Sequence, residues 1–123
     1  MPKTISIENK QRGIDGPLRI KYCDTFLTQL RGFTFRPSLA RGEGLLLVGK
    51  SDSRLESSIH MLFVSFDLAV IWINSQMQIV DKVLAKSWRP AYFSKQPAKY
   101  VLEVHPARWE EFQIGDTVLF KNA

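Results

Sequence analysis

The strongest constraint on this chain is an apolar stretch that runs from Ser58 to Asn74. Between Leu55 and Val80 there is neither Lys nor Arg, although the whole chain holds 17 such residues. Beyond Asp67, alternate side chains fall on the two faces of a strand, with Leu68, Val70 and Trp72 on one face and Ala69, Ile71 and Ile73 on the other. A half-solvated strand would alternate with polar residues. The pattern therefore predicts a central strand that is covered on both faces.

Residues 58–64 have a similar composition, and we expect them to form another buried strand before a break at residues 65–67. In this strand Ile59, Met61 and Phe63 would lie opposite His60, Leu62 and Val64. A membrane-spanning helix is the competing interpretation, and it requires roughly 20 predominantly apolar residues. Because His60, Ser65 and Asp67 interrupt the run too early, we expect no membrane segment.

Shorter strands are predicted at residues 4–7, 18–22, 45–48, 77–84, 100–104 and 117–120. The tight connection at residues 74–76 favours an antiparallel hairpin between the central strand and residues 77–84. One short helix is expected from Asp24 to about Gly32, and a second from Pro106 to about Phe112. The pattern predicts a mainly β fold, either a compact antiparallel β-sandwich of the jelly-roll kind or a flattened barrel with two short helices.

Length and composition favour one domain over residues 1–123, with enough chain to bury a core without a disulfide or a metal. The only cysteine, Cys23, reads as a small hydrophobic residue. The first residues form no apolar signal segment, so a cytoplasmic location is expected. A net charge of +5 permits anionic partners and also favours solubility.

Several short motifs occur in an order and spacing similar to those of the family known as domain of unknown function 192. They are Arg31-Gly32-Phe33, Gly42-Glu-Gly44-Leu45, Ser58-Ile-His-Met61, Trp88-Arg-Pro90, Tyr100-Val-Leu-Glu103 and Gly115-Asp116. The resemblance covers about residues 18–120 and implies a compact, mostly β fold without implying an activity. Many relatives have Pro where Asp67 stands and an acidic residue where Ala69 stands, and they tend to have Gly in place of Met77.

The residues offer limited material for catalysis. His60, His105 and Cys23 are the candidate metal ligands, but no two lie at metal-ligand spacing, so neither a metal nor a cofactor is expected. Gly42-Glu-Gly44 lacks the spacing of a phosphate-binding loop and is interpreted as a turn. A buried His60 near a carboxylate such as Asp67 would suit an acid/base pair, which keeps a small enzyme as an alternative.

Charged residues beside the buried strands allow two interpretations. Arg31 and Arg89 could form structural salt bridges with Glu43 and Glu103 that hold loops against the sheet. The alternative is a ligand pocket near the central hairpin and the loop Trp88-Arg-Pro90, with the pocket residues gathered at one mouth of the sandwich. Its candidate ligand-binding residues are Arg31, Glu43, His60, Asp67, Trp88 and Arg89.

A basic loop at residues 82–99 is the remaining feature. Its cations are Lys82, Lys86, Arg89, Lys95 and Lys99, and its aromatic residues include Trp88, Tyr92 and Phe93; the neighbouring acidic residue is Asp81, directly before the loop. These are ingredients of single-stranded nucleic-acid binding, and also of a solvated loop that aromatic residues anchor to the core. The anchored loop is the favoured interpretation. The sequence therefore predicts a small binding or accessory module with a small ligand, and a protein-interaction module is a further alternative.

Overall fold

The structure is a computed structural model that describes residues 3–16, 18–24, 38–59, 61, 64–89 and 91–122. Its strands are β1 (Thr4–Asn9), β2 (Arg19–Cys23), β3 (Glu43–Ser53), β4 (Leu68–Ile73), β5 (Ile79–Ala85), β6 (Ala98–Val104) and β7 (Val118–Asn122), and its helix is the 3-10 helix η1 (Pro106–Glu111). The seven strands form one sheet in the order β5-β4-β6-β3-β2-β1-β7. Neighbouring strands are antiparallel except β2 and β3, which are parallel.

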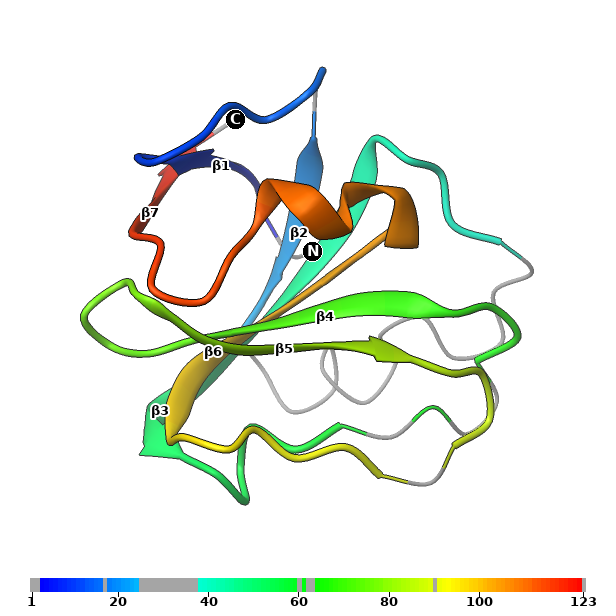
Figure 1. Ribbon diagram of the computed structural model, residues 1–123, viewed down its shortest axis with the longest axis vertical. Helices are drawn as coiled ribbons and strands as arrows, with labels where there is room; N and C mark the ends of the chain where they lie inside the picture. The colour runs from blue at the N-terminus through cyan, green and yellow to red at the C-terminus, as the bar shows by residue number, and fades with distance from the viewer. Residues whose placement is uncertain are drawn as a thin grey trace.

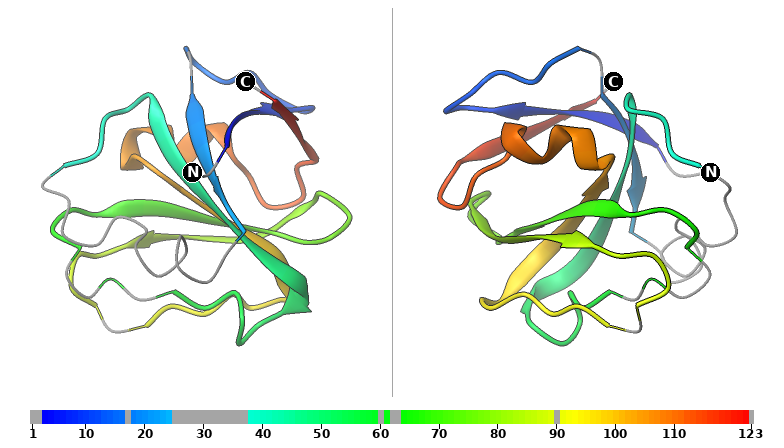
Figure 2. Two further views of the ribbon diagram at one scale, coloured as in Figure 1. Left: turned by 180° about the vertical axis from the view of Figure 1, so that it is seen from behind. Right: turned by 45° about the vertical axis from the view of Figure 1, so that its right-hand side comes forward.

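The sheet curls until its two edge strands meet at one corner. There the N–H of Ile79 donates to the carbonyl of Asp116 at 2.8 Å, and the N–H of Gly115 donates to the carbonyl of Ile79 at 2.8 Å. A bridge between Gln78 and Thr117 adds to this contact. The outcome is the half-barrel of Figure 1, seen from two further sides in Figure 2. The expected mainly β fold is thus confirmed, and the flattened barrel describes it better than two separate sheets.

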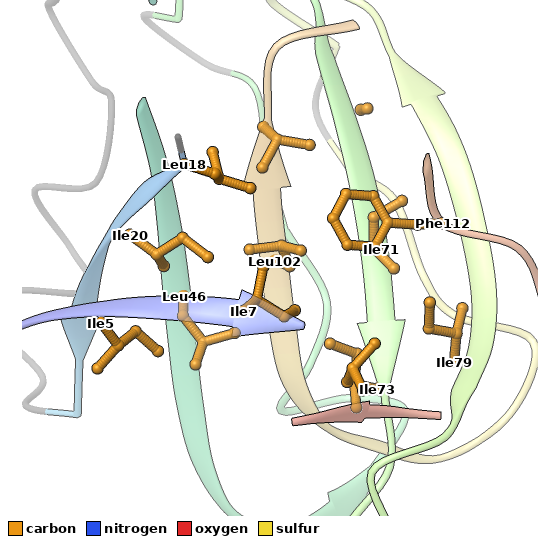
Figure 3. Close-up of a cluster of buried hydrophobic side chains, with 13 residues drawn as sticks. Ile5, Ile7, Leu18, Ile20, Leu46, Ile71, Ile73, Ile79, Leu102 and Phe112 are labelled. Atoms are coloured by element: carbon orange, nitrogen blue, oxygen red, sulfur yellow. The ribbon is translucent and has the colours of Figure 1, made fainter. Parts of the chain in front are cut away.

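Strand β4 is buried along its whole length, as predicted. Ala69, Ile71 and Ile73 belong to the inner core, which fills the concave side of the sheet together with Leu102, Phe112 and residues of β1, β2 and β3 (Figure 3). Leu68, Val70 and Trp72 belong to the outer core, which lies on the opposite face with Leu45, Met61 and Val101. The two-sided apolar pattern therefore arises because one strand serves two cores.

Two extended segments, one containing Ile59 and the other Tyr92, cover the outer core along the lower side of the molecule in Figures 1 and 2. Ile59 and Tyr92 join them by exchanging backbone hydrogen bonds of 3.0 and 2.8 Å. The prediction of a continuous strand over residues 58–64 is wrong for Met61 and Val64, which belong to no strand and are linked by a turn hydrogen bond of 3.1 Å. These residues are apolar because they pack onto the sheet from outside it, where their side chains are buried.

The second predicted helix is confirmed as η1. Pro106 occupies its first turn, and Nδ1 of His105 accepts the N–H of Ala107 at 3.0 Å. The first predicted helix, from Asp24 to about Gly32, lies outside the described residues except for Asp24. Within the described ranges, no helix is long and apolar enough to cross a membrane.

Candidate functional site

The turn that follows β5, at residues 86–89, is held by side chains from two other segments. Oδ1 of Asp67, just before β4, accepts the N–H of Ser87 at 2.9 Å, and its Oδ2 lies 3.5 Å from Nζ of Lys86. The hydroxyl oxygen of Tyr92 accepts the N–H of Lys86 at 2.7 Å. Asp67 and Tyr92 thus fix the backbone from which the next two side chains project.

Trp88 occupies the tip of this turn in an unusual conformation. Its φ is +67°, in the left-handed region that side chains larger than glycine rarely adopt. Its N–H donates to the carbonyl of Met61 at 2.8 Å, and the N–H of Met61 donates to the carbonyl of Arg89 at 2.9 Å. Even so, the residue is 52% exposed. The turn is therefore ordered by its backbone while a large aromatic ring stays half in solvent.

Arg89 follows Trp88 in this turn and is also exposed. Its guanidinium carbon is 5.8 Å from the centre of the Tyr92 ring, a cation–π contact. Among the described residues no carboxylate pairs with Arg89, so a structural salt bridge from Arg89 to either Glu43 or Glu103 does not form. The donors of Arg89 remain available to an acceptor from outside.

Glu43 is placed differently from this turn. It begins β3, where its Oε1 accepts the N–H of Ala40 at 3.0 Å. The register aligns Gly44 with Val104 and Val104 with Ala69, so Glu43 and Asp67 lie at the same end of the sheet. They belong to strands separated by β6, about 10 Å apart at the usual strand spacing. The structure thus brings Asp67, Trp88 and Arg89 together, with Glu43 two strands away.

Arg31 and His60 lie outside the described residues, as does Pro90 of the predicted loop. Their place in a site stays a prediction. Lys82 does not lie with the other cations of the predicted basic loop. Its Nζ is 3.9 Å from the centre of the Trp109 ring, on the inner face of the sheet. Lys99 contacts the ring of Tyr100 at 5.4 Å.

Glu103 acquires a property that its sequence motif does not reveal. It faces the outer core between Leu45 and Val70, its neighbours in register on β3 and β4, and is only 7% exposed. Burial raises the pKa of its carboxyl to about 7. In the part of the chain that the structure describes, no cation pairs with it. The signal in the sequence was a carboxyl within an apolar strand, but a carboxyl in such a place is usually expected to form a salt bridge.

Gly44 has a packing role that explains the motif Gly42-Glu-Gly44. A Cβ at this position would lie 3.1 Å from Cγ1 of Val104 and 3.3 Å from the carbonyl oxygen of Glu103. Such contacts are tighter than normal packing, so glycine lets β3 approach β6 closely. The motif is structural, as a turn leading into a strand.

Other polar groups missed by sequence reasoning close the fold. The Asp116 carboxylate accepts hydrogen bonds from Arg12 at 2.6 and 2.8 Å, from Asn9 at 2.8 Å and from the N–H of Gln113 at 2.9 Å. The hydrogen bonds from Arg12 hold the pKa of Asp116 far below its ordinary value. Arg108, 2% exposed, donates to the carbonyl of Arg41 at 2.6 Å.

Across the described ranges, no group of three His, Cys, Asp or Glu side chains could hold a metal ion.

The fold and the turn together define a small curled β domain with one ordered aromatic and cationic turn beside its central hairpin. A family model, DUF192 (Uncharacterized ACR), matches residues 7–120. The chain belongs to this family.

Relatives and solved structures agree with this membership. The chain is 34% identical to the UPF0127 protein TK1120 of Thermococcus kodakarensis over 91% of its own length and 71% of the relative's. It is 27% identical to a UPF0127 protein of Pyrococcus abyssi, over 91% of this chain and 94% of that one. Two crystal structures share the fold. A Sinorhizobium meliloti protein named as a candidate transcription regulator has a TM-score of 0.81 at 17% identity, with 98% and 94% of the two chains covered. A protein of unknown function from Novosphingobium aromaticivorans has a TM-score of 0.75 at 18% identity, with 94% and 83% covered.

Proposed function

We propose that this protein is a small binding module whose contact surface is centred on Trp88 and Arg89. The observation that carries the proposal is the state of Trp88, a half-exposed aromatic residue at a positive φ. Holding a large residue in this region costs on the order of 1 kcal/mol or more, and strain of this kind clusters at functional sites. Because the residue is half exposed, burial of the ring offsets only part of that cost.

The neighbouring groups support such a contact. A ring face can stack on a planar or apolar part of a ligand, while the guanidinium of Arg89 can donate to an acceptor on the same ligand. Asp67 already accepts the N–H of Ser87, so its part in the proposal is to position the turn. Glu43 stands about 10 Å away across two strand spacings and would be reached only by a larger ligand.

We extend the proposal to two further residues, to the extent of the domain and to the location of the protein. Arg31 and His60 are assigned to the surface on the sequence alone, and the acid/base alternative depends on His60. We also propose that residues 1–123 form one domain, because a single sheet draws strands from Thr4 to Asn122. A cytoplasmic location agrees with a fold that contains one buried cysteine, Cys23, and needs no disulfide.

An NMR titration of labelled protein tests the binding proposal. The probes are mononucleotides, short oligosaccharides, amino acids and an eight-nucleotide single strand, added one class at a time. We expect at least one class to shift the Trp88 indole and Arg89 Nε signals, because these groups form the contact. Trp88→Gly should abolish the response while the free energy of unfolding stays within about 1 kcal/mol, since glycine accepts the positive φ.

Ile114→Ala is the matched control. Ile114 is 60% exposed and lies next to Gly115, which contacts Ile79 at the opposite end of β5 from the turn. This variant should bind as the natural protein does. Silence of both signals with every probe, or binding that survives Trp88→Gly, would contradict the proposal.

A further inference from the structure

Residues 91–95 present their side chains alternately to the protein and to solvent. Tyr92 packs against the outer core and Ser94 is fully buried, whereas Ala91, Phe93 and Lys95 are exposed. This is the period-two pattern of an extended chain, and the backbone pairing of Tyr92 with Ile59 fixes it. The exposed residues therefore project from one side of a segment that the protein holds rigid.

Trp88, Arg89, Phe93 and Lys95 form what we call the cation–aromatic strip. Phe93 is 51% exposed and Trp88 is 52% exposed, so the strip shows solvent two aromatic rings. Residues two apart on an extended chain are about 7 Å apart, and the strip from residue 88 to residue 95 spans at most about 24 Å. Rings and cations thus alternate along the sequence of the strip.

The charged side chains of the strip are all cations. Residues 86–95 contain three Lys and Arg residues and no Asp, Glu, Asn or Gln. Lys86 lies 3.5 Å from Asp67, which leaves Arg89 and Lys95 as the cations of the strip itself. Phosphate groups only accept hydrogen bonds, and nucleobases offer ring faces, so both match what the strip presents. Sugar hydroxyls also need acceptors, and the exposed part of the strip offers no carboxylate or amide.

We infer that the cation–aromatic strip binds single-stranded nucleic acid, with bases stacked on Trp88 and Phe93 and phosphates beside Arg89 and Lys95. This inference rests on the proposed binding function and names its ligand class. No sequence-specific contact is implied, because stacking and phosphate contacts tolerate every base. The ligand lies along the outer side of the segment, and the outer core on its inner side keeps the rings in place.

The alternative partner for the same surface is a protein. Nε of Arg54 donates to the carbonyl of Ser94 at 2.9 Å, and this contact brings the neighbouring Leu55, which is 75% exposed, close to the strip. Leu55 would extend the rings into an apolar patch. It has no role in nucleic-acid binding, so substitution of Leu55 separates the two partners.

Fluorescence anisotropy with 5′-labelled eight-nucleotide oligothymidine and oligouridine tests the inference. Kd should rise roughly tenfold between 50 and 200 mM salt, as expected for two or three neutralised phosphates on a single strand. Trp88→Gly and Phe93→Ala should each weaken binding by between about five- and a hundredfold, the range for loss of one stacked base. Lys95→Ala should reduce the salt slope by about 0.7. Lys121→Ala, which removes a cation of β7 that pairs with Glu8 of β1, should leave Kd unchanged.

Three outcomes would overturn the inference, and they differ from failure of the binding proposal. Equal affinity for polyglutamate, with no effect of Phe93→Ala, would mean a general anion surface. Loss of binding in Leu55→Ala to the same degree as in Phe93→Ala would mean an apolar docking patch. Absence of oligonucleotide binding, with Trp88 still shifted by another probe in the NMR titration, would remove nucleic acid and keep the binding module. Silence of Trp88 with every probe would remove both.

Discussion

Met77 and Trp88 have similar backbone strain, but they differ in how much packing offsets it. Their φ values are +65° and +67°, both in the left-handed region. Met77 lies in the β4–β5 turn, where its N–H donates to Asn74 at 3.0 Å and its side chain packs against the inner core. Packing offsets the strain there. Trp88 has much less burial to offset the same strain.

The buried carboxyl of Glu103 makes the free energy of unfolding depend on pH. Its carboxyl is neutral in both states below its ordinary pKa of 4.5, and above that value the unfolded chain ionises first, because burial raises the folded pKa to about 7. Stability from this group is therefore fully present at pH 4 and is lost as pH rises through 7, by roughly 3 kcal/mol.

Glu103→Gln removes the ionisation and keeps the shape. We expect the variant to match the natural protein in urea unfolding at pH 4 and to exceed it by roughly 3 kcal/mol at pH 8. The difference between the two proteins at each pH cancels the titration of other groups. A variant that is less stable than the natural protein at pH 8 would mean that a cation stabilises the ionised carboxylate, contrary to this account.

At the scale of elements, the corner where β5 meets β7 depends on Asp116. Its carboxylate joins Arg12 and Asn9, which lie just after and at the end of β1, to the turn before β7. The side chain of Asp116 is only 5% exposed, so these hydrogen bonds form largely out of water. A buried carboxylate with charged and neutral donors is worth more than a surface ion pair.

Asp116→Asn should therefore lower the free energy of unfolding by about 2–3 kcal/mol at pH 7. The folded pKa of Asp116 is depressed, so its contribution is present above the ordinary pKa of 3.8 and is lost as pH falls below that value. Urea unfolding at pH 7 and at pH 2.5 should show the difference shrinking toward acid. Asp15→Asn is the control, because Asp15 is 82% exposed in its pair with Arg41 and should matter little. An equal loss in both variants would contradict the role assigned to the corner.

At the scale of the whole molecule, one sheet separates an inner core from an outer core. β4 contributes to both, with Ile71 on one side and Trp72 on the other. The indole of Trp72 donates to the carbonyl of Ser57 at 2.8 Å, which ties the covering segment to the sheet. Because β4 cannot lose one core and keep its place in the other, we expect both cores to unfold together.

Two variants with a single tryptophan test this expectation. One keeps Trp72 in the outer core through Trp88→Phe and Trp109→Phe, and the other keeps Trp109 beside the inner core through Trp72→Phe and Trp88→Phe. In each variant the midpoint of fluorescence change in urea should equal the midpoint by far-UV circular dichroism. Separate midpoints would mean that the cores unfold independently and that residues 1–123 do not behave as one domain.

Much of the fold follows from local sequence patterns. The alternation of Leu18, Ile20 and Tyr22, the apolar run of β4 and the start of η1 at Pro106 each depend on residues a few positions apart. The turn after β5 was also predictable in part, since Trp88 and Arg89 stood out as an aromatic and a cation in a long loop. Asp67 was grouped with them as a ligand-binding residue, but its hydrogen bond to the N–H of Ser87, 20 positions away, could not be predicted.

Backbone periodicity, which is a property of neighbouring residues, was enough to predict most of the strands and the burial of β4 on both faces. Only the tertiary structure decided that residues 61 and 64 cover the sheet without joining it, that β2 and β3 are parallel, and that Glu103 is buried away from the described cations. It also paired Arg12 with Asp116 across 104 positions. Burial and pairing depend on which distant segments meet, and an apolar or charged residue looks the same in the sequence whichever neighbours it receives.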